Sequence, residues 1–185
     1  MTNKVAMATL NLMPHPERPP ADPAFRLWVN VDRSGAFGDS ATVNLFYCIA
    51  APVGRFAIPE PGAGERRDGL WKTSCFEVFL KEEGATAYSE WNFSPSGDWA
   101  AYCFSDRREG MSEAEVGAPS YIRLEDNLTR WGLGATIAVP AAQVYRVGLS
   151  AVIEEQDGTI SYWALAHPPG APDFHHEDCF AARLG

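Results

Sequence analysis

The sequence is poor in positive charge. Lys and Arg together number 15 against 24 Asp and Glu, which gives a formal net charge of -9 at pH 7. Proteins that bind nucleic acid or anionic membrane surfaces need clustered basic side chains to neutralise phosphate groups. The composition therefore argues against a nucleic-acid partner and against a membrane partner.

Long apolar runs are missing as well. No stretch approaches the roughly 20 apolar residues that are needed to span a bilayer. Residues 1–12 alternate apolar and polar side chains, and they lack the basic, apolar and small-residue regions of a signal peptide. We therefore expect a cytoplasmic protein.

Cysteines are few and widely spaced. Cys48, Cys75, Cys103 and Cys179 include no C-x-x-C pair, which excludes the spacings of zinc ribbons and thioredoxins. Each cysteine falls in an apolar strand pattern, so we predict small buried side chains in the reduced state. A disulfide between neighbouring strands is the alternative if the protein is exported.

Catalytic motifs are also lacking. The sequence contains no G-x-S-x-G elbow, no phosphate-binding loop and no H-E-x-x-H helix. Glu77 and Glu90 would suit a glycosidase only if their separation and a cleft allowed it. We therefore predict a non-catalytic binding protein and not an enzyme.

Short apolar runs separated by Pro and Gly make up most of the chain. This rhythm is typical of antiparallel β structure. With 185 residues and 46% hydrophobic residues, we predict one domain over residues 1–185, an all-β, two-sheet antiparallel β-sandwich with very little helix. The predicted strands are residues 5–12, 25–32, 41–50, 74–80, 87–93, 98–104, 120–125, 132–139, 146–153, 160–167 and 178–184. Residues 112–116 suggest a short helical turn.

Two predicted hairpins determine which side chains share a face. Asp157 and Gly158 are expected at the centre of a two-residue turn, which would place Val152 beside Trp163. A turn through residues 94–97 would pair Phe93 with Asp98 and place Asn92 beside Trp99.

One sheet face then mixes carboxylate, amide and indole groups. The alternation of side chains along residues 74–80 and 87–93 turns Glu77, Glu90 and Asn92 away from the core, and the predicted hairpin adds Trp99. Such a face suits a neutral polyhydroxylated ligand, because the indole packs on C–H groups while the polar groups bind hydroxyls. The alternative is an ordinary solvated sheet face with one partly exposed tryptophan.

Residues 68–80, D-G-L-W-K-T-S-C-F-E-V-F-L, and residues 91–97, W-N-F-S-P-S-G, resemble motifs of the DOMON-like superfamily and, within it, of the family 9 carbohydrate-binding modules. The resemblance implies a β-sandwich with a ligand site at one face or end, used for sugars in some members and for haem in the cytochrome-type members. By position, Trp71 and Glu77 match the aromatic and acidic residues of the motif L-W-x-x-D-x-x-E-[VI]-[FY]-L. Ser74 stands where that motif has Asp.

Haem and metal are further possibilities. Met111 with His167, His175 or His176 would form an axial pair, although no C-x-x-C-H attachment motif is present. Residues 167–178 hold the densest cluster of metal-capable groups, but adjacent histidines on an extended chain point in opposite directions, which favours a rigid surface turn. We predict no cofactor, with haem or a divalent cation as the alternative.

The leading interpretation is a groove that binds a saccharide or a sugar-like small molecule. An alternative is a structural or protein-interaction domain that forms a homodimer through one sheet face. The predicted ligand-binding residues are Trp71, Glu77, Glu90, Asn92, Trp99, Arg108, His167 and His175.

Overall fold

A computed structural model describes residues 7–51, 54–126 and 130–185. In this part of the chain the all-β class is confirmed: the helical structure consists of the 3-10 turns η1 (Leu70–Lys72) and η2 (Glu177–Cys179). The same residues contain no helix that is both long and apolar enough to cross a membrane.

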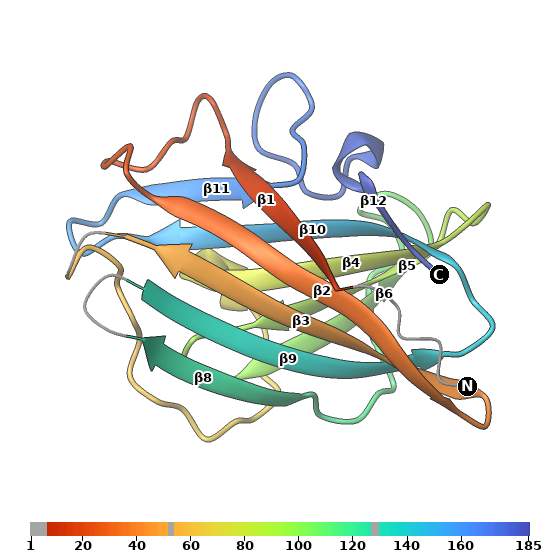
Figure 1. Ribbon diagram of the computed structural model, residues 1–185. Coiled ribbons are helices and arrows are strands. Elements are labelled where there is room, and N and C mark those ends of the chain that lie inside the picture. Colours follow the sequence, from red (N-terminus) through yellow and green to blue (C-terminus); the bar gives the residue numbers. More distant parts are fainter. Residues whose placement is uncertain (1–6, 52–53, 127–129) are drawn as a thin grey trace.

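The strands form two antiparallel sheets that lie face to face (Figure 1). The first sheet contains, in spatial order, β1 (Ala8–Pro14), β2 (Arg26–Phe37), β3 (Ser40–Ala50), β9 (Arg130–Pro140) and β8 (Ser120–Asp126). The second contains β7 (Ser112–Glu113), β6 (Trp99–Phe104), β5 (Tyr88–Phe93), β4 (Cys75–Glu82), β10 (Tyr145–Glu154) and β11 (Ile160–Ala164), with β12 (Ala182–Leu184) beside the start of β10.

Strand β1 joins the two sheets along one side of the sandwich. Its first part pairs with β2, and its end, Met13 and Pro14, pairs with β11. The strands therefore follow one hydrogen-bonded path from β7 to β8. This continuity removes two of the free edges that separate sheets would present to other chains.

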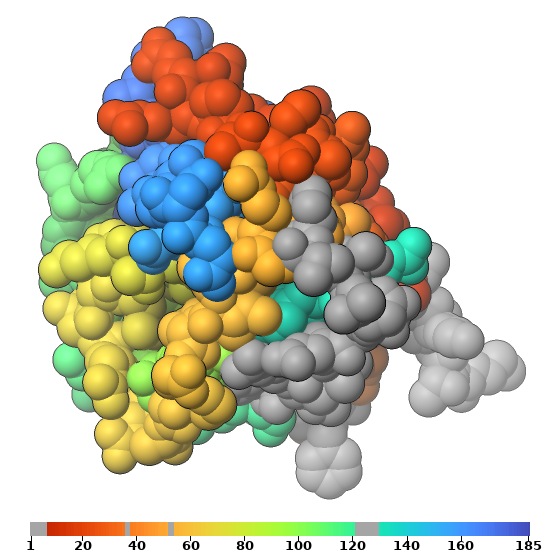
Figure 2. Space-filling view, turned by 90° about the vertical axis from the view of Figure 1, so that its left-hand side faces the viewer, coloured from red at the N-terminus to blue at the C-terminus, as the bar shows by residue number. Residues whose placement is uncertain are grey.

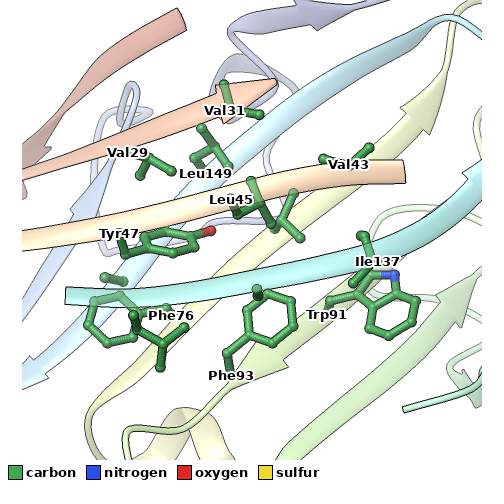
Figure 3. Packing of buried hydrophobic residues seen from close by; sticks show 14 of the residues in the cluster. Val29, Val31, Val43, Leu45, Tyr47, Phe76, Trp91, Phe93, Ile137 and Leu149 are labelled. Atoms are coloured by element: carbon green, nitrogen blue, oxygen red, sulfur yellow. The ribbon is translucent and has the colours of Figure 1, made fainter. Parts of the chain in front are cut away.

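The core lies between the sheets because side chains alternate along each strand. Residues of β3 alternate between buried and half-buried along most of the strand, so one face meets the other sheet. Figure 3 shows this packing, with Tyr47 of β3 next to Phe76 of β4. The Tyr47 hydroxyl donates a hydrogen bond of 2.6 Å to the backbone carbonyl of Glu77. This bond crosses the core and links β3 of the first sheet to β4 of the second.

Strands β4 and β5 are buried on both faces. Phe76 and Phe93 face the main core, whereas Phe79 and Tyr88 belong to a second hydrophobic cluster on the outer face of the second sheet. Phe180 and other residues from the C-terminal part of the chain cover that face. The outer face of this sheet is therefore shielded from water.

The predicted strands are found, with three local differences. Strand β11 ends at Ala164, so residues 165–167 of the predicted strand lie beyond it. Residues 112–116 contain the short strand β7 and not a helical turn, because Ser112 and Glu113 pair with the edge strand β6. Residues 178–184 are divided between η2 and β12. Residues 5 and 6 of the first predicted strand lie outside the described residues.

Both predicted hairpin registers are wrong by one residue. Phe93 pairs with Trp99, and Ala151 pairs with Trp163. Each connection contains a glycine with positive φ, 108° at Gly97 and 85° at Gly158. A glycine with positive φ is compatible with hairpin connections of more than one length. The connection can therefore differ by one residue from the predicted turn, which shifts the strand register by one.

This shift moves Trp99 to the opposite face of the sheet. The Trp99 side chain is buried in the main core, stacked on Trp91 with ring centroids 6.0 Å apart. The second shift places Val152 in the outer cluster and Trp163 in the core. The predicted placement of Trp99 beside Asn92 is therefore wrong.

Residues 54–74, which precede β4, lie along one end of the sandwich (Figure 2, gold to yellow). Ala57 N–H donates to the carbonyl of Glu154, and Arg67 N–H donates to the carbonyl of Trp99. The Arg66 guanidinium lies over the Trp99 ring, 4.8 Å from its centroid. These contacts attach the segment that precedes η1 to strands β10 and β6 of the second sheet.

The cysteines differ in exposure. Cys75 and Cys179 are buried, Cys48 is half-buried and Cys103 is exposed, and all four, which lie within the described residues, are free thiols. Burial raises the pKa of Cys48 to about 11 and that of Cys179 to about 12. The expectation of buried cysteines is therefore wrong for Cys103.

Trp99→Ala should destabilise the protein by about 3–5 kcal/mol, because it removes a large buried ring from a close-packed core. Urea unfolding followed by circular dichroism measures this loss. Trp28→Ala is the matched control, since Trp28 is half-buried on the outer side of β2. A loss for Trp99→Ala no greater than for Trp28→Ala would contradict the core position of Trp99.

Cys103 should be the thiol that reacts quickly in the native protein, because only a thiolate in contact with solvent attacks a disulfide reagent at speed. Titration with dithionitrobenzoate should show a fast phase of about one thiol per chain, followed by the others in denaturant. Cys103→Ser should abolish the fast phase. Fast reaction in that variant would contradict the assigned burial.

Candidate ligand-binding pocket

The outer face of the second sheet forms the floor of the pocket. Three adjacent strands place polar side chains in a row: Ser150 of β10 is opposite Glu77 of β4, which is opposite Asn92 of β5. Glu90 lies two residues before Asn92 on the same face, because side chains alternate along a strand. The predicted grouping of Glu77, Glu90 and Asn92 on one face agrees with this register.

One wall of the pocket comes from η1. Gly69 has a positive φ of 76° at the start of this turn, which allows the chain to bend sharply before Trp71. The Tyr102 hydroxyl on β6 donates to Asp68 Oδ1 at 2.5 Å, and the Tyr102 ring meets the Trp71 ring edge to face at 5.9 Å. These contacts hold the Trp71 indole beside the floor.

The opposite wall comes from the segment between β11 and η2. Phe174 is buried against Tyr162 of β11, with ring centroids 6.1 Å apart. The His175 ring meets the rings of Phe79 and Phe104 edge to face. Segments from distant parts of the sequence therefore close over the same sheet face.

A cavity of about 250 Å³ remains between the floor and these walls. Its lining combines carboxyl, aromatic, imidazole, guanidinium and thioether groups. The lining residues are Trp71, Glu77, Glu90, Phe104, Arg108, Met111, Tyr162, Pro172, Phe174 and His175.

Glu77 is 2% exposed, although its carboxyl group reaches the pocket. Burial raises its pKa well above the ordinary range, and the nearby Glu90 raises it further. The hydroxyl of Ser150 donates to Glu77 Oε2 at 3.0 Å and, with Arg108, opposes this rise in pKa. Glu77 therefore binds its proton more tightly than a solvent-exposed carboxyl group does.

Glu90 is 5% exposed. Burial raises its pKa to about 7, against the opposing effects of the Asn92 amide and Arg108. The Asn92 amide donates to Glu90 Oε1 at 2.7 Å, and the Cys75 thiol donates to Asn92 Oδ1 at 3.5 Å. Asn92 thus orients the Glu90 carboxyl from beneath the pocket.

His175 is a neutral imidazole at neutral pH. Burial lowers its pKa to about 4, and Arg108 contributes to this shift. The Tyr88 hydroxyl accepts the backbone N–H of Arg108 at 3.2 Å and is hydrogen-bonded to His175 Nδ1 at 2.7 Å. The other ring nitrogen, Nε2, is 3.7 Å from Glu90 Oε2.

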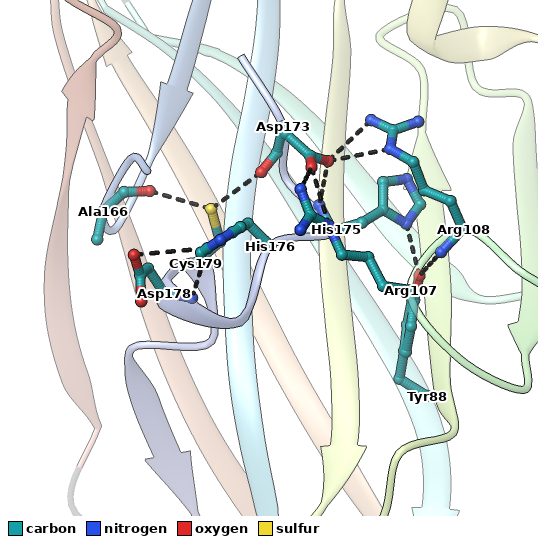
Figure 4. A network of polar contacts seen from close by, with 9 residues as sticks. All are labelled: Tyr88, Arg107, Arg108, Ala166, Asp173, His175, His176, Asp178 and Cys179. Atoms are coloured by element: carbon teal, nitrogen blue, oxygen red, sulfur yellow. Dashed lines mark hydrogen bonds and ion pairs between the residues drawn. The ribbon is translucent and has the colours of Figure 1, made fainter. Parts of the chain in front are cut away.

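Asp173 holds the two arginines of the rim (Figure 4). Arg108 Nε donates to Asp173 Oδ1 at 3.0 Å, and Arg107 bonds to the other carboxylate oxygen. Arg108 also has a positive φ of 57°, a backbone conformation that is uncommon outside glycine and asparagine. This network positions the Arg108 guanidinium at the edge of the pocket.

Most of the predicted binding residues come together here. Trp71, Glu77, Glu90, Arg108 and His175 line the pocket, and Asn92 lies beneath it. Trp99 and His167 lie elsewhere.

Trp99 is on the core face of the sheet. His167 donates from Nε2 to the carbonyl of Met13 at 2.8 Å and lies beside His15, with ring centroids 4.8 Å apart. His167 is therefore not part of the pocket lining that contains His175.

Sequence reasoning missed several of the apolar residues that line the pocket. Tyr162 reaches the pocket through the hairpin register that was predicted wrongly, and Phe174 comes from a loop that was interpreted as a rigid surface turn. The alternation of side chains along β11, which puts Tyr162 and Ala164 on one face, was the available signal for Tyr162. No local sequence pattern indicates that Phe174 lines the pocket.

The cofactor alternatives stay predictions. Met111 and His175, two of the side chains considered for haem, line the same pocket, whereas His167 and His176 do not. In residues 7–51, 54–126 and 130–185, no three His, Cys, Asp or Glu side chains gather into a metal-binding group.

Comparisons with known proteins support the fold. No protein-family model matches the chain, and no curated protein is significantly similar to it. A crystal structure from Bacteroides uniformis ATCC 8492, of a protein named "putative carbohydrate-binding protein", is similar with a TM-score of 0.58 and 14% sequence identity, over 98% of this chain and 86% of that chain. This likeness shows a shared fold and not a shared ligand. The DOMON-like resemblance stays a prediction.

Glu90→Gln should stabilise the protein more at pH 8 than at pH 5. The folded state binds the Glu90 proton more tightly than the unfolded state, whose pKa is near 4.5, so stability is lost as pH rises from about 4.5 to about 7. A glutamine side chain does not ionise, so Glu90→Gln avoids this loss of folding stability, which is roughly 1–3 kcal/mol.

The measurement is urea unfolding of both proteins at the two pH values, with Glu82→Gln as the control because Glu82 is exposed on β4. An equal difference between Glu90→Gln and the wild type at pH 5 and pH 8 would contradict the raised pKa of Glu90.

Proposed function

We propose that the protein is a non-catalytic binding module and that its pocket holds a small saccharide. The observation that carries this proposal is the pocket floor, where Glu77, Glu90 and Asn92 lie on one face beside the indole of Trp71. Carboxyl and amide groups form hydrogen bonds with sugar hydroxyls, while an aromatic ring packs on the apolar C–H face of a sugar.

The size of the pocket favours a single sugar unit. A volume of about 250 Å³ lies just below the range of about 300–1,000 Å³ that is usual for small-molecule sites. Phe174 and His175 close the side opposite Trp71. A monosaccharide, or the end of a longer saccharide, fits this shape better than the middle of a polysaccharide chain.

The electrostatics support binding over hydrolysis. A retaining glycosidase needs one protonated and one ionised carboxyl group, so the two environments push the pKa values apart. Here burial raises the pKa of both Glu77 and Glu90. Both carboxyl groups are therefore shifted in the same direction by their surroundings, whereas the two carboxyl groups of a glycosidase take opposite roles.

Trp71→Ala should weaken saccharide binding at least about tenfold, which corresponds to about 1.4 kcal/mol, because it removes the ring on which the sugar packs. Calorimetric titration against a panel of monosaccharides and disaccharides measures the affinity. Trp28→Ala is the matched control, since Trp28 is half-buried on the other sheet. Unchanged affinity in Trp71→Ala, or no binding of any saccharide by the wild type, would reject the proposed site.

A further inference from the structure

The two pocket carboxyl groups have no cationic side chain paired with them. Across residues 7–51, 54–126 and 130–185, no lysine or arginine lies within ion-pair distance of Glu77 or Glu90, and the His175 contact at 3.7 Å involves a neutral ring. Arg108 is the cation that acts on both groups, yet its guanidinium is bonded to Asp173.

Ionisation of these carboxyl groups is costly in a protein without a ligand. A buried carboxylate is stable only when a cation or several donors compensate for lost hydration. Glu77 receives one hydroxyl bond and Glu90 one amide bond. The carboxyl groups of the pocket floor could therefore pair with a further positively charged group.

The pocket walls, like the floor, are suited to a cation. The aromatic rings of Trp71, Phe104, Tyr162 and Phe174 and the thioether of Met111 surround the space above the carboxyl groups. Aromatic faces attract a cation through their negative quadrupole, and this attraction grows where water is excluded. Aromatic walls over a floor of carboxyl groups are complementary to an ammonium group.

We propose that the ligand carries a protonated amine, an amino sugar in place of a neutral one, and that its ammonium group lies between Glu77 and Glu90. This inference rests on the proposed saccharide function and makes the ligand class specific. The aromatic walls contact the sugar ring, and the two carboxyl groups supply the charge-assisted hydrogen bonds.

Binding of an ammonium group is then linked to proton release. An ionised carboxylate is the form that pairs with the amine, so ligand binding favours release of the protons held by Glu90 and Glu77, both of whose pKa values are raised by burial. The other titratable groups that face the two carboxyls hold their states in this range: Cys75, Tyr88 and Tyr102, whose pKa values are raised by burial, stay neutral, and His175 stays uncharged above about pH 5. The Arg108 guanidinium stays bonded to Asp173.

The test compares matched pairs that differ in one group: D-glucosamine with D-glucose, D-galactosamine with D-galactose, and D-mannosamine with D-mannose. In calorimetric titrations of the full chain, at least one amino sugar should bind about tenfold or more tightly than its neutral partner. Its affinity should rise at least about fivefold from pH 6 to pH 7 as Glu90 ionises. Titrations in buffers of different ionisation enthalpy should show protons released.

Glu90→Gln separates charge from shape. The amide oxygen of the substituted side chain can still accept the Asn92 hydrogen bond, so folding is preserved while the charge is removed. Amino-sugar affinity should fall about tenfold or more and lose its pH dependence, whereas Glu82→Gln, an exposed change on the same sheet, should behave as the wild type.

The outcomes distinguish the two proposals. Equal or tighter binding of the neutral partner, or binding without proton release, would overturn the amine and leave the saccharide site in place. Failure of every sugar in both series to bind would overturn both.

Discussion

Water is kept away from both faces of β4 and β5, and the electrostatics of the pocket depend on this constraint. An antiparallel sheet usually buries one face and hydrates the other. Here η1 and the segment that leads into η2 cover the second face, so Glu77, Glu90 and Asn92 lie in a low-dielectric layer. Burial is the first cause of the raised pKa of both carboxyl groups. If this cover were absent, the same side chains would be ordinary solvated groups.

The floor and the walls of the pocket differ in how they are held. The floor is built on strands that also form the main core, and the Tyr47 hydroxyl fixes the Glu77 carbonyl from the core side. The parts of the walls that come from loops are held by side-chain hydrogen bonds: Tyr102 bonds to Asp68 before η1, Tyr88 bonds to His175, and Asp173 bonds to Arg108. Groups on strands are held more rigidly than groups on loops. The carboxyl groups therefore set the chemistry, and the loops complete the enclosure.

The sequence patterns predicted the fold class, most strand positions and most of the residues that line the pocket floor, but not the hairpin registers. The Asp157-Gly158 pair fits connections of more than one length, so local sequence could not choose between them. Because side chains alternate with a period of two, a one-residue error in the other hairpin reversed the face of Trp99. Partner-strand packing decided that register: the large indole of Trp99 is buried against Trp91.

The sequence by itself determined that Glu77, Glu90 and Asn92 share one sheet face, because alternation along a strand is a local property of the backbone. Only the tertiary structure decided that this face is buried, that Phe174 and His175 close over it, and that burial raises the pKa of both carboxyl groups. These properties depend on contacts between segments far apart in the chain, and no local pattern encodes which distant loop will cover a given face.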